Sequence, residues 1–138
     1  MKHVRRIPNR ISELRPLSAW ATEIARGLGC SESRCQDVDL CLTEAVANII
    51  CHGYSDDAPH EITVELASDS ETLAMRIEDD ARPFDPLARC VEQPASLDEA
   101  APAGRGLLLM RSTATSMSYE RVESRNRLTL RFVVDHSP

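Results

Sequence analysis

The chain has 138 residues, of which 42% are hydrophobic and 28% are charged, and its formal net charge at pH 7 is −6. Such a length and composition are typical of one globular domain, residues 1–138, with room for a hydrophobic core. The acidic balance argues against direct nucleic-acid binding, because phosphate contacts favour a basic face. No apolar run approaches the roughly 18 residues of a membrane-spanning helix, so we expect no membrane contact.

The five cysteines, at positions 30, 35, 41, 51 and 90, form no C-x-x-C pair. An odd number of scattered cysteines is typical of reduced thiols rather than of disulfides or a zinc site. The basic N-terminal residues are not followed by an apolar stretch, so the sequence predicts no secretory signal. Together these features predict a cytoplasmic protein.

The first elements in chain order are an edge strand and an amphipathic helix. Residues 2–8 are predicted to form a short strand, which Pro8 limits to the edge of a sheet. Residues 14–28 follow the i, i+3, i+4, i+7 pattern of a helix with one apolar face. That face consists of Leu17, Trp20, Ala21, Ile24, Ala25 and Leu28.

A second helix follows, and it is apolar almost all round. Either Ser31 or Ser33 is suited to cap its N-terminus, and the helix is predicted to run to about His52 and to end at Gly53. Its apolar residues include Leu40, Leu42, Ala45, Val46, Ala47, Ile49 and Ile50. A helix of this kind is buried in a core.

Two hairpins are predicted in the rest of the chain. Residues 61–67 and 72–78 alternate apolar and polar side chains across a short turn, which is the pattern of two antiparallel strands. Residues 117–119 and 128–134 alternate in the same way, with a turn at 123–126.

Between the hairpins, residues 87–103 show no sustained period and are predicted to be irregular. A glycine-flanked turn at 104–106 is then predicted to lead into an apolar helix that ends near Thr115. The order of helices, hairpin, helix and hairpin favours an α+β fold. We expect a two-layer sandwich with the helices packed on one face of a mainly antiparallel sheet.

Three features of this arrangement are not explained by packing. Glu44, Asn48 and His52 recur every four residues in the buried helix and therefore form one polar stripe. Burying a carboxylate and an amide without partners costs on the order of 1–3 kcal/mol or more, so the stripe is expected to face a wet pocket. Carboxylate and amide oxygens there could hold a hard cation such as Mg²⁺.

The second and third features are Asp79-Asp80 at the end of a strand and Gly104-x-Gly106 before a helix. Taken alone, each has an ordinary structural explanation, because aspartate and glycine both favour turns. In this order the three features suit a nucleotide. An acid can bind the adenine amino group, an amide can hold magnesium, and backbone N–H groups at a helix N-terminus can bind phosphate.

On these residues the sequence resembles the GHKL ATP-binding (Bergerat) fold. Within it the chain is similar to serine-protein kinases of the RsbW/SpoIIAB type, which are bacterial anti-sigma factors. The family's N box matches Glu44-Ala-Val-Ala-Asn48, followed by His52-Gly53-Tyr54. The G1 box matches residues 79–86, the G2 box matches residues 104–107, and the pattern at 126–130 is also family-like.

The resemblance implies roles for individual residues. Glu44 would be the general base that accepts the proton of a serine hydroxyl on a partner protein. Asn48 would coordinate Mg²⁺ bound to the ATP phosphates, and Asp79 would hydrogen-bond the adenine. Residues 87–103 would form the ATP lid. The phosphate-binding turn would consist of Gly104, Arg105, Gly106 and Leu107.

The chain departs from the family at Ala81, where glycine is usual. A methyl group there would weaken ATP binding if the backbone had a positive φ or lay against the nucleotide. The departure gives weight to an alternative function, a non-catalytic module of the same fold that sequesters a sigma factor or another regulator.

The partners also follow from the resemblance. They would be a sigma factor and a STAS-domain antagonist that the kinase phosphorylates on serine or threonine. A homodimer is expected, with the N-terminal strand and the first helix as its surface. A freestanding domain of a histidine kinase is a third hypothesis. The sequence offers no phospho-acceptor helix for it, because His3, His60 and His136 are interpreted as surface residues and His52 as a residue that caps the helix or lies at the edge of the pocket.

Overall fold

The computed structural model describes residues 1–84 and 102–136, and for residues 102–105 and 107 it describes the backbone alone. The N-terminal elements are β1 (Lys2–Pro8), the 3₁₀ turn η1 (Ile11–Glu13), α1 (Leu14–Gly27), α2 (Glu32–Asn48) and the π-helical turn η2 (Ile49–Gly53). They are followed by β2 (Glu61–Ser68), β3 (Thr72–Asp79), α3 (Pro102–Thr113), β4 (Ser116–Val122) and β5 (Arg125–Val133).

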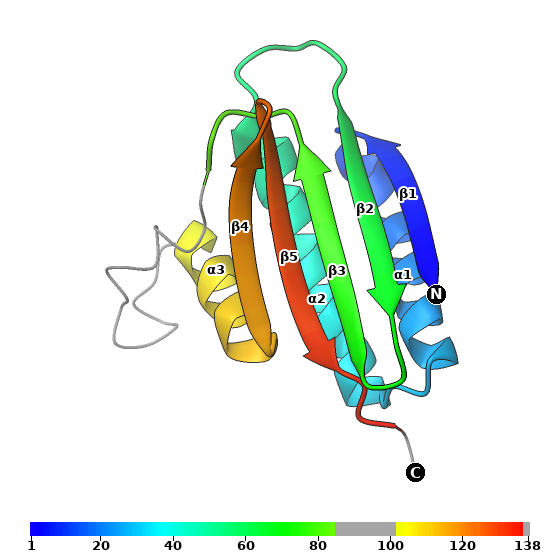
Figure 1. Ribbon diagram of the computed structural model, residues 1–138. Coiled ribbons are helices and arrows are strands. Elements are labelled where there is room, and N and C mark those ends of the chain that lie inside the picture. The colour runs from blue at the N-terminus through cyan, green and yellow to red at the C-terminus, as the bar shows by residue number, and fades with distance from the viewer. Residues whose placement is uncertain (85–101, 137–138) are drawn as a thin grey trace.

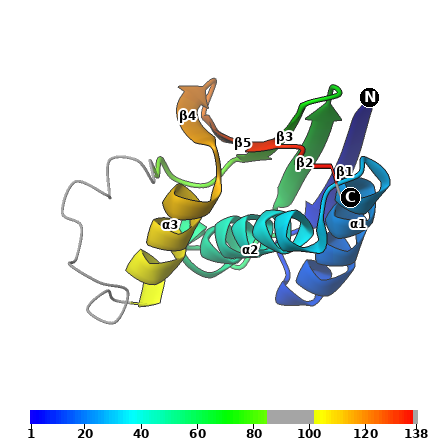
Figure 2. The same cartoon turned by 90° about the horizontal axis from the view of Figure 1, so that it is seen from below.

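The strands form one antiparallel sheet in the order β1-β2-β3-β5-β4. All three helices lie on the same face of this sheet, with α2 behind its centre (Figures 1 and 2). Helix α2 packs against α1 on one side and α3 on the other. The predicted two-layer α+β sandwich is therefore confirmed, including the edge position of the first strand.

The alternation of the strands explains why one face of the sheet is buried. Every second residue of β3 and of β5 up to Phe132 is buried beneath the helices, and so is every second residue of β2 from Ile62 to Leu66. The helices supply the opposing side chains, such as Leu17, Ala21, Val38, Leu42 and Val46. Burial of a leucine, isoleucine or valine side chain contributes about 1.5–3 kcal/mol, so this layer holds the two halves of the sandwich together. None of the helices in the described ranges is long and apolar enough to span a membrane.

Helix α2 begins at a capped N-terminus. The Oγ atom of Ser31 accepts a hydrogen bond from the backbone N–H of Arg34 at 3.1 Å. The carboxylate of Asp135 binds the backbone N–H of Ser31 at 3.0 Å and accepts a hydrogen bond from its hydroxyl. Of the two serines that the sequence offered, Ser31 is thus the cap.

Helix α2 ends at Asn48, before the predicted end near His52, and the chain continues as the π-helical turn η2. Gly53 is the last residue of this turn, and a Cβ atom built on it would lie 2.9 Å from the Cβ of Ala81. The missing side chain lets the turn after β3 approach the end of α2 closely. The backbone N–H of Arg82 reaches the carbonyl of Gly53 at 3.4 Å, and its guanidinium donates to the carbonyl of His52 at 3.0 Å.

Helix α3 differs from the prediction. The helix already begins at Pro102, so Gly104 and Gly106 lie in its first turns rather than in a turn before it, and it ends at Thr113 rather than near Thr115. Proline suits the first position of a helix, and a glycine inside a helix costs only about 1 kcal/mol relative to alanine. Most of the predicted lid, residues 87–101, lies outside the described residues, and its last two residues open α3.

The second hairpin is confirmed and turns over two residues, Glu123 and Ser124. Both have positive φ, 49° and 66°, as in the two-residue turns whose twist matches a hairpin. This turn sets the register of β5 and places Asn126 directly opposite Asp79 of β3.

Candidate functional site

Two of the three predicted motifs meet between α2 and α3. Gly106 is buried against the side chain of Glu44. A Cβ atom built on Gly106 would lie 2.3 Å from Oε2 of Glu44 and 3.1 Å from its carboxyl carbon. The backbone of α3 therefore passes directly over the carboxylate, and only glycine leaves room for it.

Asn48 lies one helical turn beyond Glu44, at the last residue of α2. Both side chains are half-buried, and neither has a hydrogen-bonding partner in the part of the chain that the structure describes. A carboxylate and an amide at this spacing share one helix face and leave their oxygens available to a ligand. His52, the third residue of the predicted stripe, lies in the π-helical turn and is exposed.

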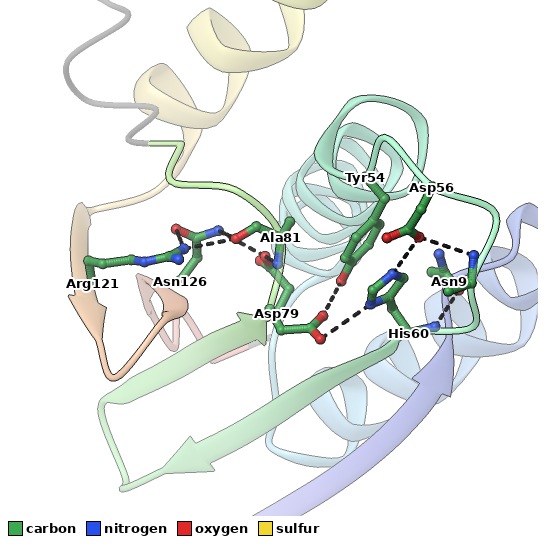
Figure 3. A network of polar contacts seen from close by, with 10 residues as sticks. Asn9, Tyr54, Asp56, His60, Asp79, Ala81, Arg121 and Asn126 are labelled. Carbon is green, nitrogen blue, oxygen red and sulfur yellow. Dashed lines mark hydrogen bonds and ion pairs between the residues drawn. The ribbon is translucent and has the colours of Figure 1, made fainter.

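Asp79 lies at the end of β3 and is 3% exposed. Its Oδ1 atom accepts hydrogen bonds from the backbone N–H of Ala81 and from Nδ2 of Asn126, both at 2.9 Å (Figure 3). Burial raises the pKa of this carboxyl, and the two donors offset part of the rise. Within the described residues no donor binds Oδ2, which is therefore available to the amino group of a ligand.

The turn after Asp79 is fixed by β4 and β5. Nδ2 of Asn126 donates to the carbonyl of Arg82 at 2.9 Å, and the guanidinium of Arg121 donates to the carbonyl of Ala81 at 2.8 Å. The hydroxyl of Tyr119 and the guanidinium of Arg121 both donate to Oδ1 of Asn126. Asn126 and Arg121 thus position Asp79, the residue predicted to bind adenine. Neither of them was among the predicted site residues.

Ala81 fits this turn without strain. Among the described residues other than glycine, positive φ occurs at Glu123, Ser124 and His136, so the backbone of Ala81 does not require glycine. Its methyl group is buried against Gly53. The glycine at position 53 therefore accommodates the methyl group that the family usually lacks.

A second polar group binds the other side of the same turn. The rings of Tyr54 and His60 stack with centroids 4.0 Å apart and planes 13° from parallel. The hydroxyl of Tyr54 donates to Asp80 at 2.9 Å, and the ring nitrogens of His60 face Asp80 at 3.2 Å and Asp56 at 2.8 Å. His60 is 17% exposed, so it is a half-buried residue at the surface that these contacts hold in place.

The remaining predicted residues lie at the start of α3. Gly104 is in its first turn, and the side chains of Arg105 and Leu107 lie outside the described residues. Their contact with phosphate stays a prediction. The described donor set fits ATP and Mg²⁺, because it offers an open carboxylate oxygen at Asp79 and an unengaged amide at Asn48.

Comparison with known proteins identifies the family. Residues 7–132 match the histidine kinase-like ATPase domain. The chain belongs to this family. The serine/threonine-protein kinase BtrW of Bordetella bronchiseptica is 36% identical over 92 residues, which are 66% of this chain and 65% of BtrW. This match therefore spans slightly less than two thirds of the relative.

A solved structure shares the fold. The RsbU and RsbW domains of Rv1364c from Mycobacterium tuberculosis match 96% of this chain and 32% of that one, with a TM-score of 0.66 and 16% sequence identity. The resemblance to the GHKL fold and to its RsbW-type members is thereby confirmed. Membership in an ATPase family implies ATP binding, whereas the roles of single residues stay predictions.

Proposed function

We propose that this protein is an ATP-dependent serine/threonine kinase and anti-sigma factor. It phosphorylates a STAS-domain antagonist and, when the antagonist is phosphorylated and released, sequesters a sigma factor. The observation that carries this proposal is the Glu44 carboxylate, held beneath the backbone of Gly106 one helical turn from Asn48. The family, the name of BtrW and the RsbW-like fold support the same activity.

Each residue of the site has a role in this proposal. Asp79 binds the adenine amino group, Asn48 holds Mg²⁺, and the start of α3 binds the phosphates. Bound ATP and Mg²⁺ supply the transferable phosphoryl group and neutralise its charge. Glu44 accepts the proton of the serine or threonine hydroxyl on the partner, which makes the oxygen a better nucleophile.

The proposal includes an assembly. The chain acts as a single catalytic domain with residues 87–103 as the ATP lid. It forms a homodimer through β1 and α1. One surface binds the sigma factor, and the antagonist presents its hydroxyl to Glu44. No direct contact with nucleic acid or membrane is part of this function.

The test separates binding from transfer. Calorimetric titration with ATP and Mg²⁺ is expected to give saturable binding to the wild type and to Glu44→Gln, and none to Asn48→Ala. Transfer of labelled phosphate to the STAS protein is expected to fall by about a hundredfold or more in Glu44→Gln, because a general base typically contributes that much. Gln36→Ala, at an exposed position of the same helix, is the control and is expected to leave ATP binding and phosphate transfer unchanged.

Two outcomes contradict the proposal in different ways. A wild type that binds no nucleotide at millimolar concentration refutes the ATP site. A wild type that binds ATP but transfers no phosphate favours the non-catalytic module that Ala81 suggested. The fit of the Ala81 methyl group against Gly53 weakens that alternative, because the methyl group fills a space that glycine leaves.

A further inference from the structure

None of the roles in the proposed function involves His60, whose ring lies between two carboxylates. Its Nε2 atom is 2.8 Å from Oδ1 of Asp56, and its Nδ1 atom is 3.2 Å from Oδ2 of Asp80. Tyr54 covers one face of the ring (Figure 3), and its hydroxyl donates to the same Asp80 at 2.9 Å. The backbone N–H of His60 donates to Oδ1 of Asn9 at the end of β1, so the ring is held from several elements.

Both hydrogen bonds can form together only when the ring is charged. A neutral imidazole carries one N–H and can donate to one of the two carboxylates, whereas its other nitrogen would present a lone pair to the second. Only the imidazolium donates to both. The hydrogen bond to Asp56 and, after it, that to Asp80 raise the pKa of His60 against the opposing effect of burial.

The other groups around the ring do not change this charge balance. Asp56 from the same loop and Asp80 from the end of β3 are the charged groups that face the ring in the described structure. The phenol of Tyr54 stays protonated, because burial and Asp80 raise its pKa. Asn9, from the β1 side, is neutral. Loss of the proton from His60 therefore leaves two carboxylates facing one donor.

The position of Asp80 connects this cluster to the nucleotide site. Asp80 directly follows Asp79. On one side of the turn that these two residues begin, Asn126 of β5 and Arg121 of β4 hold it in place. On the other side, Tyr54 and His60 bind Asp80. The turn that presents Asp79 is thus held from both sides, and the contacts on the Asp80 side depend on a titratable histidine.

We propose that His60 is a positioning residue for the nucleotide site. Its imidazolium form holds Asp80 and so fixes the turn that presents Asp79. This inference rests on the proposed ATP site. A histidine whose pKa is raised in the folded state gives its full contribution at low pH and loses it as the pH rises through that pKa. Nucleotide affinity accordingly falls as His60 loses its proton.

The experiment measures ADP affinity with Mg²⁺ by calorimetry from about pH 5.5 to about pH 8.5, which spans ordinary histidine titration. The wild type is expected to bind about fivefold more weakly above the His60 pKa, the effect of one hydrogen bond. His60→Gln is expected to lose this step, and His136→Gln, at the opposite end of the sheet, to keep it. Protonation of ADP itself is the same for all variants.

A further variant distinguishes positioning from a structural role. Asp56→Asn removes one carboxylate from the ring but leaves Asp80 in place, so it lowers the His60 pKa. The His60 titration followed by NMR is expected to move to lower pH. The affinity step is expected to shrink, because a neutral ring can then donate from Nδ1 to Asp80 and accept at Nε2 a hydrogen bond from the amide at position 56. A step of equal size in the wild type and His60→Gln would overturn the inference, and so would a His60 pKa at or below that of ordinary histidine.

Failure of the proposed function gives a different result. If no variant binds ADP at any pH, the ATP site is refuted, and hydrogen exchange then decides the role of His60. The backbone N–H of Ala81 donates to Asp79, and that of Arg82 donates to the carbonyl of Gly53. Their protection is expected to fall about fivefold through the His60 pKa in the wild type, and equal protection across this range would overturn the inference.

Discussion

Glycine at position 106 is explained by the carboxylate beneath it. A methyl group there would collide with the end of the Glu44 side chain, which is flexible and can rotate away. Gly106→Ala is therefore expected to fold but to displace the proposed base. Phosphate transfer is expected to fall by about tenfold or more, because small misplacements of a catalytic group are costly. ATP affinity is expected to fall less than transfer does, because the substitution disturbs only the phosphate contacts proposed for the start of α3 and leaves Asn48 and Asp79 in place.

The matched control is Gly27→Ala. Gly27 lies at the end of α1, and no atom lies within 4 Å of a Cβ built on it. Alanine there is expected to raise the free energy of unfolding by about 0.5–1 kcal/mol and to leave transfer unchanged. Steady-state transfer rates and urea unfolding of both variants provide the measurement. Normal transfer by Gly106→Ala would show that Glu44 does not act from its observed position.

Residues differ in how well the sequence predicted them. The stripe of Glu44 and Asn48 was visible because helical spacing places both on one buried helix. Asn126 and His60 were missed because their partners lie far along the chain: Asn126 binds Asp79 across 47 positions and His60 binds Asp80 across 20. For Asn126 there was a signal, since it occupies an inward position of β5 beside Leu128. A polar residue in such a register requires a buried partner.

At the scale of elements, periodicity predicted the order of the strands and of the first two helices, but not all of their ends. Helix α2 ends four residues before His52, and β4 and β5 each extend three residues further toward their turn than predicted. Periodicity failed at the start of α3. Because glycine favours turns over helices, Gly104 and Gly106 were assigned to a turn before the helix. The structure places Gly106 inside the helix for a tertiary reason, its contact with Glu44 of α2. Local propensity contains no information about that contact.

The cap of α2 gives a test at this scale. Ser31→Ala removes the acceptor for the N–H of Arg34 and the hydroxyl that binds Asp135. It is expected to lower the free energy of unfolding by about 1 kcal/mol, as for other N-caps. Ser33→Ala, two residues further on and exposed, is expected to change it by less than about 0.5 kcal/mol. Urea unfolding of both variants measures the difference, and equal losses would contradict the assignment of Ser31 as the cap.

At the scale of the whole molecule, the second face of the sheet carries charged side chains that pair across the strands. The helices cover the other face of the sheet (Figure 2). Arg76 binds Glu65 at 2.9 Å, and Arg127 binds both Glu78 and Glu120 at 2.8 Å. Because these pairs join β2, β3, β5 and β4 in turn, the uncovered face adds cross-strand contacts to the sheet.

Glu78 is the centre of this network. Its carboxylate faces Arg127 at 2.8 Å, Arg125 at 3.8 Å and Arg76 at 3.9 Å. Glu78→Gln leaves three arginines close together without that charge, so we expect the free energy of unfolding to fall by about 1 kcal/mol at low salt. Added salt screens the repulsion and is expected to shrink the loss. Glu61→Gln breaks an exposed pair with Arg6 at 3.8 Å and is expected to cost nearly nothing. Urea unfolding at low and high salt measures both variants, and a loss for Glu78→Gln that does not depend on salt would mean that shape rather than charge makes this residue important.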